Sequence, residues 1–218
     1  MIKIEYTEVV GIGHAIRGMR NPMNSWDKSD SEFIYDSHDW ASFRVGEKDM
    51  ELAQKLNKGG SVHAKYRRMI VVYCDIVAPL YWWKEFDTYR AGVEKNSCST
   101  MHKIHSKEFT MDDFSTDHLD ENSKSHLQSL IYCLERARIM MKNSRSEKNK
   151  KEWWWQMIQL LPSSYNQRRT VMMSYEALAN MYRWRKDHKL DEWRTFCSWI
   201  ESLPYSEIIT GGQSDEQE

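Results

Sequence analysis

The chain has 218 residues, enough for one domain with a substantial core. Its 31 Lys and Arg against 32 Asp and Glu leave a net charge of -1, so the basic excess of a nucleic-acid-binding protein is absent. The four cysteines are dispersed without a C-x-x-C pair, which argues against a zinc knuckle or a dithiol redox motif. With neither a signal peptide nor a bilayer-spanning apolar run, the chain is expected to be a soluble protein of the reducing cytoplasm.

The N-terminal region predicts a strand, a short helix and a loop. Residues Ile2–Val10 alternate and are rich in β-forming residues, which indicates a half-buried strand ending at Gly11. A helix is expected around His14–Met19, and the Asn-Pro pair that follows ends it. Ser25–Ser42 is polar and aromatic without a clear period, so it is predicted to be a loop.

A helix and a buried strand follow. Glu47–Asn57 carries apolar residues at helical spacing and stops at a Gly-Gly pair, a typical end of a helix. Lys65–Val77 ends in a β-branched, nearly uncharged run, which predicts a buried strand.

Pro79 separates this strand from a helix, because proline has no amide proton for a sheet ladder and its fixed φ suits a first helical turn. Trp82, Phe86 and Tyr89 then recur at helical spacing. The polar segment Glu94–Thr100 is predicted to be a loop whose small hydroxyl and amide groups match phosphate oxygens. It is a candidate anion or nucleotide cradle, with a solvated turn as the alternative.

The C-terminal half is predicted to be helical. An acidic loop over Thr110–Asn122 leads into a long amphipathic helix from Ser123, whose apolar residues repeat every three or four positions. The remaining predicted helices carry Trp153–Trp155, span Thr170–Arg185 and span Asp191–Ser202. We expect one domain over residues 1–205 and a polar, disordered tail over 206–218.

Two side chains suggest specific chemistry. Asn180 shares a helical face with Ala177 and Met181, and on a buried face its amide would need a partner from the backbone or a ligand. A Cys98 thiolate beside Arg90 and Lys95 would have a lowered pKa and could add to carbon 6 of a pyrimidine. An inert loop cysteine is the alternative.

Other polar clusters are interpreted as surface. His102 and His105 form H-x-x-H near several aspartates, but the region is loop-like and a solvated surface is favoured over a metal site. The pairs Arg67-Arg68 and Arg168-Arg169 are typical of surface charge.

Several motifs occur in a characteristic order. They are R-x-x-R at Arg17 and Arg20, His63 before a strand, the Ala-Pro that precedes the helix leading to Arg90, the N-S-C-S of residues 96–99, and a late L-P…R…N…R segment. In order and spacing the chain resembles the flavin-dependent thymidylate synthases over residues 12–193.

The signature of that family, R-H-R-x-x-S-x-N-E-x-S-x-R-Y, is only partly kept. Its R-H-R falls on Thr88, Tyr89 and Arg90, so the third residue alone survives. Farther on, Asn96 and Ser99 match, whereas the Glu, Arg and Tyr are replaced. Elsewhere, residues 158, 174 and 176 (Ile, Ser and Glu) stand where the family usually has Arg, Asn and Arg.

The resemblance implies roles for matching residues. It assigns flavin contacts to His63, Arg90 and Asn180. It assigns substrate contacts to Arg90, Asn96, Ser99, Arg168 and Arg185. Ser99 and Arg185 are also its candidate catalytic residues, to which the thiol hypothesis adds Cys98. Arg168 is accordingly the functional member of its arginine pair.

The resemblance also implies a fold and an activity. The fold is α+β, with a small mixed sheet and a larger helical layer, in a homotetramer. The activity is methylation or hydroxymethylation of dUMP or a related nucleotide at carbon 5. FAD is the implied cofactor, and methylenetetrahydrofolate and NADPH are the implied co-substrates. Because the signature is degenerate, a catalytically altered or inactive nucleotide- and flavin-binding protein is the alternative.

Overall fold

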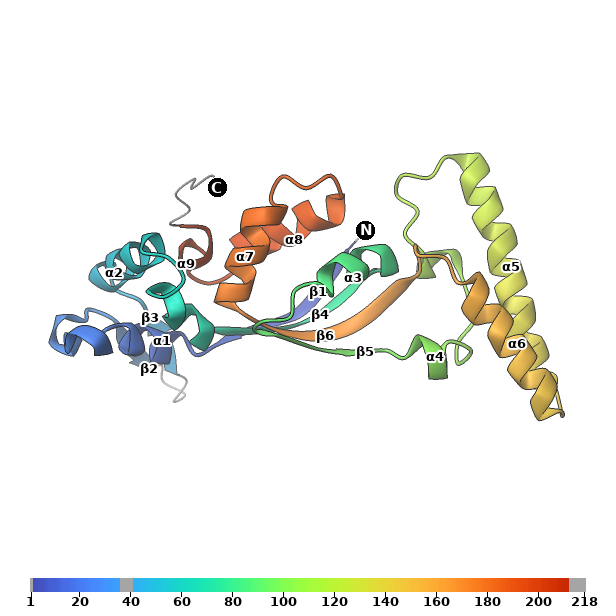
Figure 1. Cartoon of the computed structure of the whole chain (residues 1–218), viewed down its shortest axis with the longest axis horizontal. Coiled ribbons are helices and arrows are strands. Elements are labelled where there is room, and N and C mark those ends of the chain that lie inside the picture. Colours follow the sequence, from blue (N-terminus) through green and yellow to red (C-terminus); the bar gives the residue numbers. More distant parts are fainter. Residues whose placement is uncertain (1, 36–40, 212–218) are drawn as a thin grey trace. The chain divides into compact units, whose positions relative to one another are not determined.

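The computed structural model describes residues 2–35 and 41–211 and combines a small sheet with a larger set of helices (Figure 1). Four strands form one sheet in the order β1-β4-β6-β5. Their bounds are Lys3–Val10 for β1, Val71–Pro79 for β4, Val93–Ser97 for β5 and Asn166–Ser174 for β6. Two further strands, β2 (Glu32–Tyr35) and β3 (Ala41–Arg44), form a hairpin. The predicted α+β class is confirmed.

The helices carry most of the chain. Their bounds are Ile12–Met19 (α1), Glu47–Lys58 (α2), Leu80–Phe86 (α3), Thr100–Lys103 (α4), Glu121–Asn143 (α5), Glu147–Leu160 (α6), Tyr175–Arg185 (α7), Asp191–Glu201 (α8) and Glu207–Thr210 (α9). Short 3-10 helices are Asn21–Met23 (η1), Trp26–Lys28 (η2), Ala64–Met69 (η3) and Met111–Asp113 (η4). The predicted α1, α2, α5, α6 and α8 are confirmed. The helix predicted after Pro79 forms as α3 but ends at Phe86, so Tyr89 and Arg90 lie beyond it. Within the described residues, every helix is too short or too polar to cross a membrane.

The central strand β4 alternates as its sequence predicts, with Val72, Cys74 and Ile76 buried on one face. The predicted start of this strand at residue 65 is wrong, because Ala64–Met69 forms the 3-10 helix η3. The apolar run begins only at Ile70. Before it, the buried Tyr66 turns inward to α2, and this contact favours a helical turn over an extended chain.

Two other predicted segments have a different structure. Glu94–Thr100 is not simply a loop, because β5 occupies most of it as the last strand of the sheet. Edge strands are often polar, so its sequence carries no strand signal. The helix predicted over Thr170–Arg185 begins only at Tyr175, because residues up to Ser174 belong to β6.

The loop predicted over Ser25–Ser42 contains the hairpin in its described part; residues 36–40 lie outside the described residues. β2 and β3 are antiparallel, with Phe33 opposite Phe43. The two rings meet edge-on, with centroids 4.9 Å apart. This cross-strand aromatic pair supplies the register that the polar sequence does not reveal.

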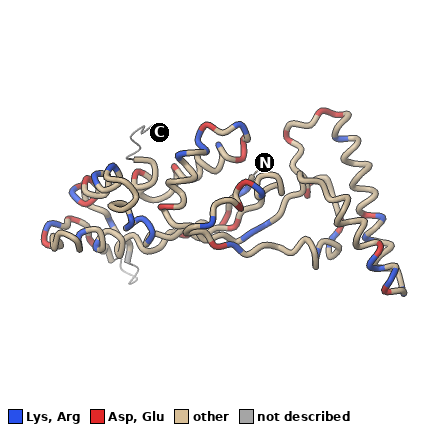
Figure 2. Tube along the Cα trace, viewed as in Figure 1, with Lys and Arg blue, Asp and Glu red and all other residues tan. Residues whose placement is uncertain are grey.

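The chain divides into two compact units. The first consists mainly of Ile76–Thr88 and Asn96–Thr170. In it, α5 and α6 pack along each other around a cluster of buried apolar residues, among them Leu134 and Met157. Lys and Arg are interspersed with Asp and Glu on these two helices (Figure 2), and large apolar side chains such as Tyr132 and Trp155 are exposed among them.

The first unit also holds an aromatic centre on α3. Trp83 is buried and donates from its indole nitrogen to the carbonyl oxygen of Gln167 at 2.9 Å. The guanidinium of Arg169 lies 4.1 Å from the centroid of the Trp83 ring and donates to Asp87 at 2.8 Å. These contacts fix α3 on β6 through both stacking and hydrogen bonds.

The second unit comprises the described parts of Ile4–Asp75, Tyr89–Lys95 and Val171–Glu218. It extends past the predicted end of the folded chain at residue 205, because α9 forms and buries Ile208 and Ile209. The rest of the predicted tail, residues 212–218, lies outside the described residues. That residues 1–205 form a single domain stays a prediction.

Candidate functional site

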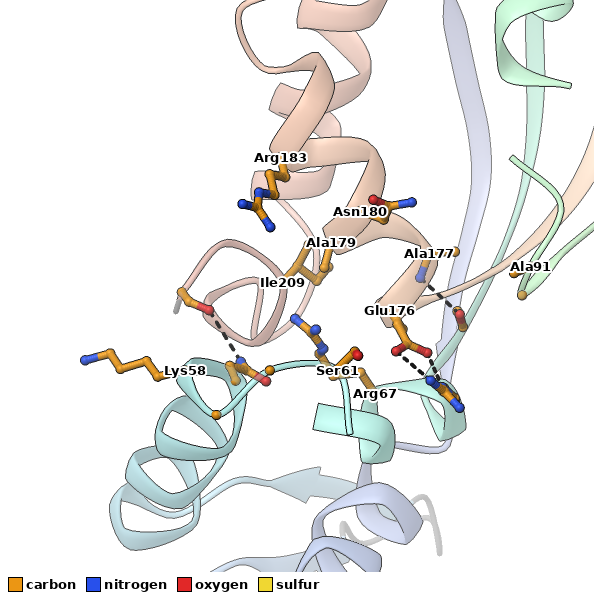
Figure 3. Close-up of a pocket in the computed structure, with 17 residues that line it drawn as sticks. Lys58, Ser61, Arg67, Ala91, Glu176, Ala177, Ala179, Asn180, Arg183 and Ile209 are labelled. Carbon is orange, nitrogen blue, oxygen red and sulfur yellow. Dashed lines mark hydrogen bonds and ion pairs between the residues drawn. The ribbon is translucent and has the colours of Figure 1, made fainter. Parts of the chain in front are cut away.

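The second unit contains a cleft of about 860 Å³ (Figure 3). It is lined by the C-terminal end of α2 and the turn after it, by η3, by the first turns of α7 and by α9. Four cationic side chains line it: Lys58, Arg67, Arg68 and Arg183. Glu176 is the acidic residue among the described lining residues. The cleft is therefore suited to an anionic ligand.

A glycine pair builds one wall of this cleft. Gly59 caps α2, and Gly60 adopts a left-handed φ of 87° that lets the chain turn toward η3. A Cβ on Gly59 would come within 3.1 Å of the His63 ring, so that ring lies directly against the wall. The strong helix stop seen in the sequence thus also shapes the cleft.

Asn57 ties three elements together beneath the cleft. Its amide donates to the carbonyl oxygen of Ile208 on α9 at 2.9 Å. Its oxygen accepts from the hydroxyl of Tyr66 on η3, also at 2.9 Å. Both side chains are buried, and the Tyr66 hydroxyl also contacts the Ala53 carbonyl oxygen on α2 at 3.1 Å. These two hydrogen bonds hold α2, η3 and α9 in register.

The N-terminal end of α7 forms the opposite wall. Ser174 is the N-cap, and its hydroxyl accepts from the amide of Ala177 at 3.2 Å. Gly92 has a left-handed φ of 70°, and a Cβ there would lie 2.5 Å from the Ser174 hydroxyl oxygen. Only glycine permits this close approach. The partial positive charge at the start of α7 adds to the cationic character of the cleft.

Arg67 is the least satisfied cation in the cleft. It is half-buried, and its Nε is buried without a hydrogen-bond partner among the described residues. Burial lowers the pKa of its guanidinium, although arginine stays charged in proteins. Arg68, in contrast, forms a two-pronged ion pair with Glu176, with one oxygen 3.0 Å from Nη2. The sequence interpretation of Arg67 as plain surface charge is therefore wrong.

Three residues expected to bind flavin lie at or beside this cleft. Asn180 lines it from α7 but is exposed, so its predicted buried position is wrong. The residue lies on the outer side of α7, whereas Ala177 and Met181 are buried. His63 is exposed against Gly59, and Arg90 is exposed just before Ala91, which lines the cleft.

Arg185, expected to hold the nucleotide, is engaged within the protein. Its Nε donates to the hydroxyl of Tyr89 at 2.9 Å, and its guanidinium lies 4.7 Å from the centroid of the Trp193 ring. Arg185 belongs to the second unit, but it is not one of the described residues that line the cleft.

The remaining predicted site residues belong to the first unit. The Cys98 amide donates to the carbonyl oxygen of Arg168 at 3.0 Å, and its carbonyl accepts from the Gln167 side chain at 2.8 Å. Ser99 caps α4 by accepting from the amide of His102 at 3.0 Å. Cys98 and Arg168 thus lie on adjacent strand ends with exposed side chains, and Asn96 is exposed on β5.

Lys58 and Arg183 were not predicted as site residues. Lys58 ends α2 and Arg183 lies near the end of α7, positions where cations are common for helix-dipole reasons alone. The sequence carried no signal that placed them at one cleft. Within the described residues, no group of three or more His, Cys, Asp or Glu is arranged to hold a metal ion.

The structure is similar to solved structures of known enzymes, although no protein-family model and no curated protein matches the sequence. A flavin-dependent thymidylate synthase ThyX from Helicobacter pylori, complexed with FAD and dUMP, aligns with a TM-score of 0.68 at 16% identity, covering 97% of this chain and 100% of that one. A second structure of the Helicobacter pylori ThyX gives 0.65 at 16% identity, covering 97% of each chain.

A UMP/dUMP methylase, PolB from Streptomyces cacaoi bound with 5-Br dUMP, aligns with a TM-score of 0.60 at 13% identity, covering 98% of this chain and 97% of that one. These similarities extend over nearly the whole chain. The fold is therefore that of the ThyX enzymes, as the motif order implied.

The cysteines give a direct test of the predicted nucleophile's accessibility. Cys98 and Cys133 are exposed, whereas Cys74 and Cys197 are buried, and burial raises the pKa of each buried thiol to about 12. Titration of the native protein with a thiol reagent at mildly alkaline pH should therefore detect two fast thiols, and four after unfolding. Cys98→Ser should remove one fast thiol. Rapid reaction of all four in the native protein would contradict this arrangement.

Proposed function

We propose that this chain is a flavin-dependent enzyme that modifies a pyrimidine nucleotide at carbon 5, methylating or hydroxymethylating dUMP or a related nucleotide. The observation that carries the proposal is the half-buried Arg67, which lines a cationic cleft of a ThyX-type fold and whose buried Nε has no hydrogen-bond partner among the described residues. A buried cation with an unsatisfied donor is costly unless other interactions compensate. The pyrophosphate of FAD is an anion that would pair with this guanidinium, and FAD is bound by the Helicobacter pylori enzyme.

The residues of the cleft fit the cofactor. Arg67, Lys58 and the N-terminal end of α7 would hold its phosphates, because guanidinium, ammonium and helix amides all favour phosphate oxygens. Asn180 offers both an amide donor and an acceptor, and His63 offers a ring at the wall. A volume of about 860 Å³ lies within the ordinary range for cofactor sites. When bound, FAD supplies hydride and electron transfer.

The substrate contacts belong to the same proposal. Asn96, Ser99 and Arg168 offer amide, hydroxyl and guanidinium groups of the kind that bind a uracil edge and a phosphate. Cys98 is the proposed nucleophile toward carbon 6 of the pyrimidine, and its backbone is fixed at both N–H and C=O on β6. Support for a dUMP-type substrate comes from the ligands of the structural neighbours.

Several further features are proposed on the resemblance alone. They are methylenetetrahydrofolate as the one-carbon donor, NADPH as the reductant, a homotetramer and a cytoplasmic location.

A second candidate function is binding without turnover. The observation that favours it is the engagement of Arg185 by Tyr89 and Trp193, which occupies a guanidinium that the family would use on the nucleotide. Glu176, in a position that usually holds Arg, is likewise committed to Arg68. A chain with these internal pairs would retain flavin and nucleotide as a sensor or an assembly subunit.

The cleft assignment predicts the effect of removing the Arg67 charge. Arg67→Met should weaken FAD binding about tenfold or more, because a charge-assisted hydrogen bond contributes about 1.5–3 kcal/mol. The measurement is a titration of the purified protein with FAD, followed by flavin fluorescence. Lys55→Met, which removes an exposed cation from α2 outside the cleft, should bind FAD like the wild type. A wild-type protein that does not bind FAD, or equal losses in both variants, would contradict the assignment.

The two candidate functions separate in a paired experiment. Calorimetry with dUMP and dCMP reports binding, and an assay with FAD, methylenetetrahydrofolate and NADPH reports transfer to carbon 5. The enzyme should turn over dUMP, and Cys98→Ser should lower the rate while the dUMP affinity stays within about threefold, since covalent addition affects chemistry more than binding. Unchanged turnover in Cys98→Ser would end the nucleophile hypothesis. Binding without turnover would select the second function.

A further inference from the structure

A second pocket, of about 330 Å³, lies between α1 and the β2–β3 hairpin in the second unit. It shares no lining residue with the cleft. Three aromatic side chains, Trp26, Phe33 and Phe43, contribute to its lining. They give the pocket flat apolar walls, which suit a planar ring.

These walls are held in place by specific contacts. The Phe33 and Phe43 rings meet edge-on, and a Cβ on Gly13 would come within 3.1 Å of both rings. The α1 backbone can therefore approach the hairpin closely only with glycine at this position. The Trp26 indole nitrogen donates to the Asn21 side chain at 2.8 Å, which orients that ring.

A buried ion pair forms the polar part of the pocket. Arg20 lines it with 4% of its surface exposed, and its Nε donates to the fully buried Asp49 at 2.5 Å. Nη1 donates to the carbonyl oxygen of Ser25 at 3.2 Å, and Nη2 has no hydrogen-bond partner among the described residues. The hydroxyls of Ser29 and Ser31 each donate to the second Asp49 oxygen at 2.6 Å. The charged Nη2 donors of Arg20 thus remain for a ligand, whereas the Ser31 oxygen also accepts from the Gly46 amide at 2.9 Å.

The charge of the pocket sets the charge of its ligand. Burial would raise the pKa of Asp49, but hydrogen bonds from Ser29, Ser31 and Arg20 outweigh it, and the pKa lies below its usual value. Asp49 is therefore ionised and balances Arg20. Arg17 also lines the pocket, is exposed, and has no ion-pair partner among the described residues. Of the charges of Arg17, Arg20 and Asp49, one positive charge is left over, which matches a carboxylate better than a phosphate monoester of nearly two charges.

We propose that this pocket binds a planar heteroaromatic carboxylate. The ring lies against Phe33, Phe43 and Trp26, a ring carbonyl accepts from Arg20 Nη2, and the carboxylate pairs with Arg17 at the rim. The site is independent of the cleft and of any activity there. A ligand bound here contacts both α1 and the hairpin and stabilises their packing.

Orotate is a suitable probe, because it is a flat ring with carbonyl acceptors and a single carboxylate. Calorimetry should detect orotate, with at least tenfold weaker binding of uracil, which lacks the charge, and of cyclohexanecarboxylate, which lacks the flat ring. Arg17→Met should weaken orotate binding at least tenfold and Arg17→Lys less, because lysine keeps the charge. Lys55→Met is the matched control and should bind orotate like the wild type. Both Arg17 variants should bind FAD like the wild type, and Arg67→Met should bind orotate normally.

Four results would overturn the proposal. The first is no orotate binding at millimolar concentration. The second is equal binding of orotate and uracil, and the third is orotate binding unaffected by Arg17→Met. The fourth is loss of orotate binding in Arg67→Met, which would place the probe in the cleft. Sedimentation of wild type and Phe33→Ser tests the remaining occupant. A smaller assembly in Phe33→Ser than in the wild type, with no orotate binding by the wild type, would assign this face to a second copy of the chain.

Discussion

The cationic cleft depends on one constraint, the placement of the Arg67 guanidinium in a half-buried position with a buried Nε that has no partner among the described residues. The neighbouring carboxylate, Glu176, pairs with Arg68 and leaves Arg67 without an ion pair in the described part of the chain. Such an arrangement costs folding free energy. Asn57 and Tyr66 fix η3 on α2 and α9, and these buried hydrogen bonds hold the backbone of Arg67 at the cleft.

The same reasoning separates the two polar sites of the second unit. In the cleft, positive charge exceeds negative charge, and the excess calls for a phosphate-bearing ligand. Around Arg20, the positive charge is balanced by Asp49, which two serine hydroxyls stabilise, and aromatic walls dominate. A cofactor such as FAD suits the first site, whereas a smaller ring with one negative charge suits the second. Differences in burial and pairing of arginines therefore give two sites of different chemistry.

The sequence predicted those helices and strands in which apolar residues recur at the spacing of the buried face. The α5 helix and the buried half of β4 were found because their apolar residues repeat as the core requires. The edge strand β5 was missed because its polar residues pair with β6 through backbone groups, which leave no side-chain pattern. The hairpin was missed for a similar reason, since a single cross-strand aromatic pair sets its register.

Site residues were predictable only where a motif carried them. Asn180 was assigned correctly to a helix but wrongly to its buried face. The face of α7 that carries Asn180 forms a wall of the cleft and is exposed. Arg67 was interpreted as surface charge, since a sequence does not reveal that Tyr66 turns its helix inward. Lys58 and Arg183 lie 125 positions apart and meet at the cleft only through the fold.

The most direct test of the Arg67 constraint is the free energy of unfolding of wild type and Arg67→Met, measured by chemical denaturation with and without FAD. If the guanidinium is held for a ligand at the expense of the fold, the variant without FAD should be more stable, by about 1 kcal/mol or more, because an unsatisfied buried donor is removed. The same saturating concentration of FAD should stabilise the variant less than the wild type, by about 1.4 kcal/mol for each tenfold loss of affinity. A variant that is less stable without FAD, and that FAD stabilises as much as the wild type, would contradict the account.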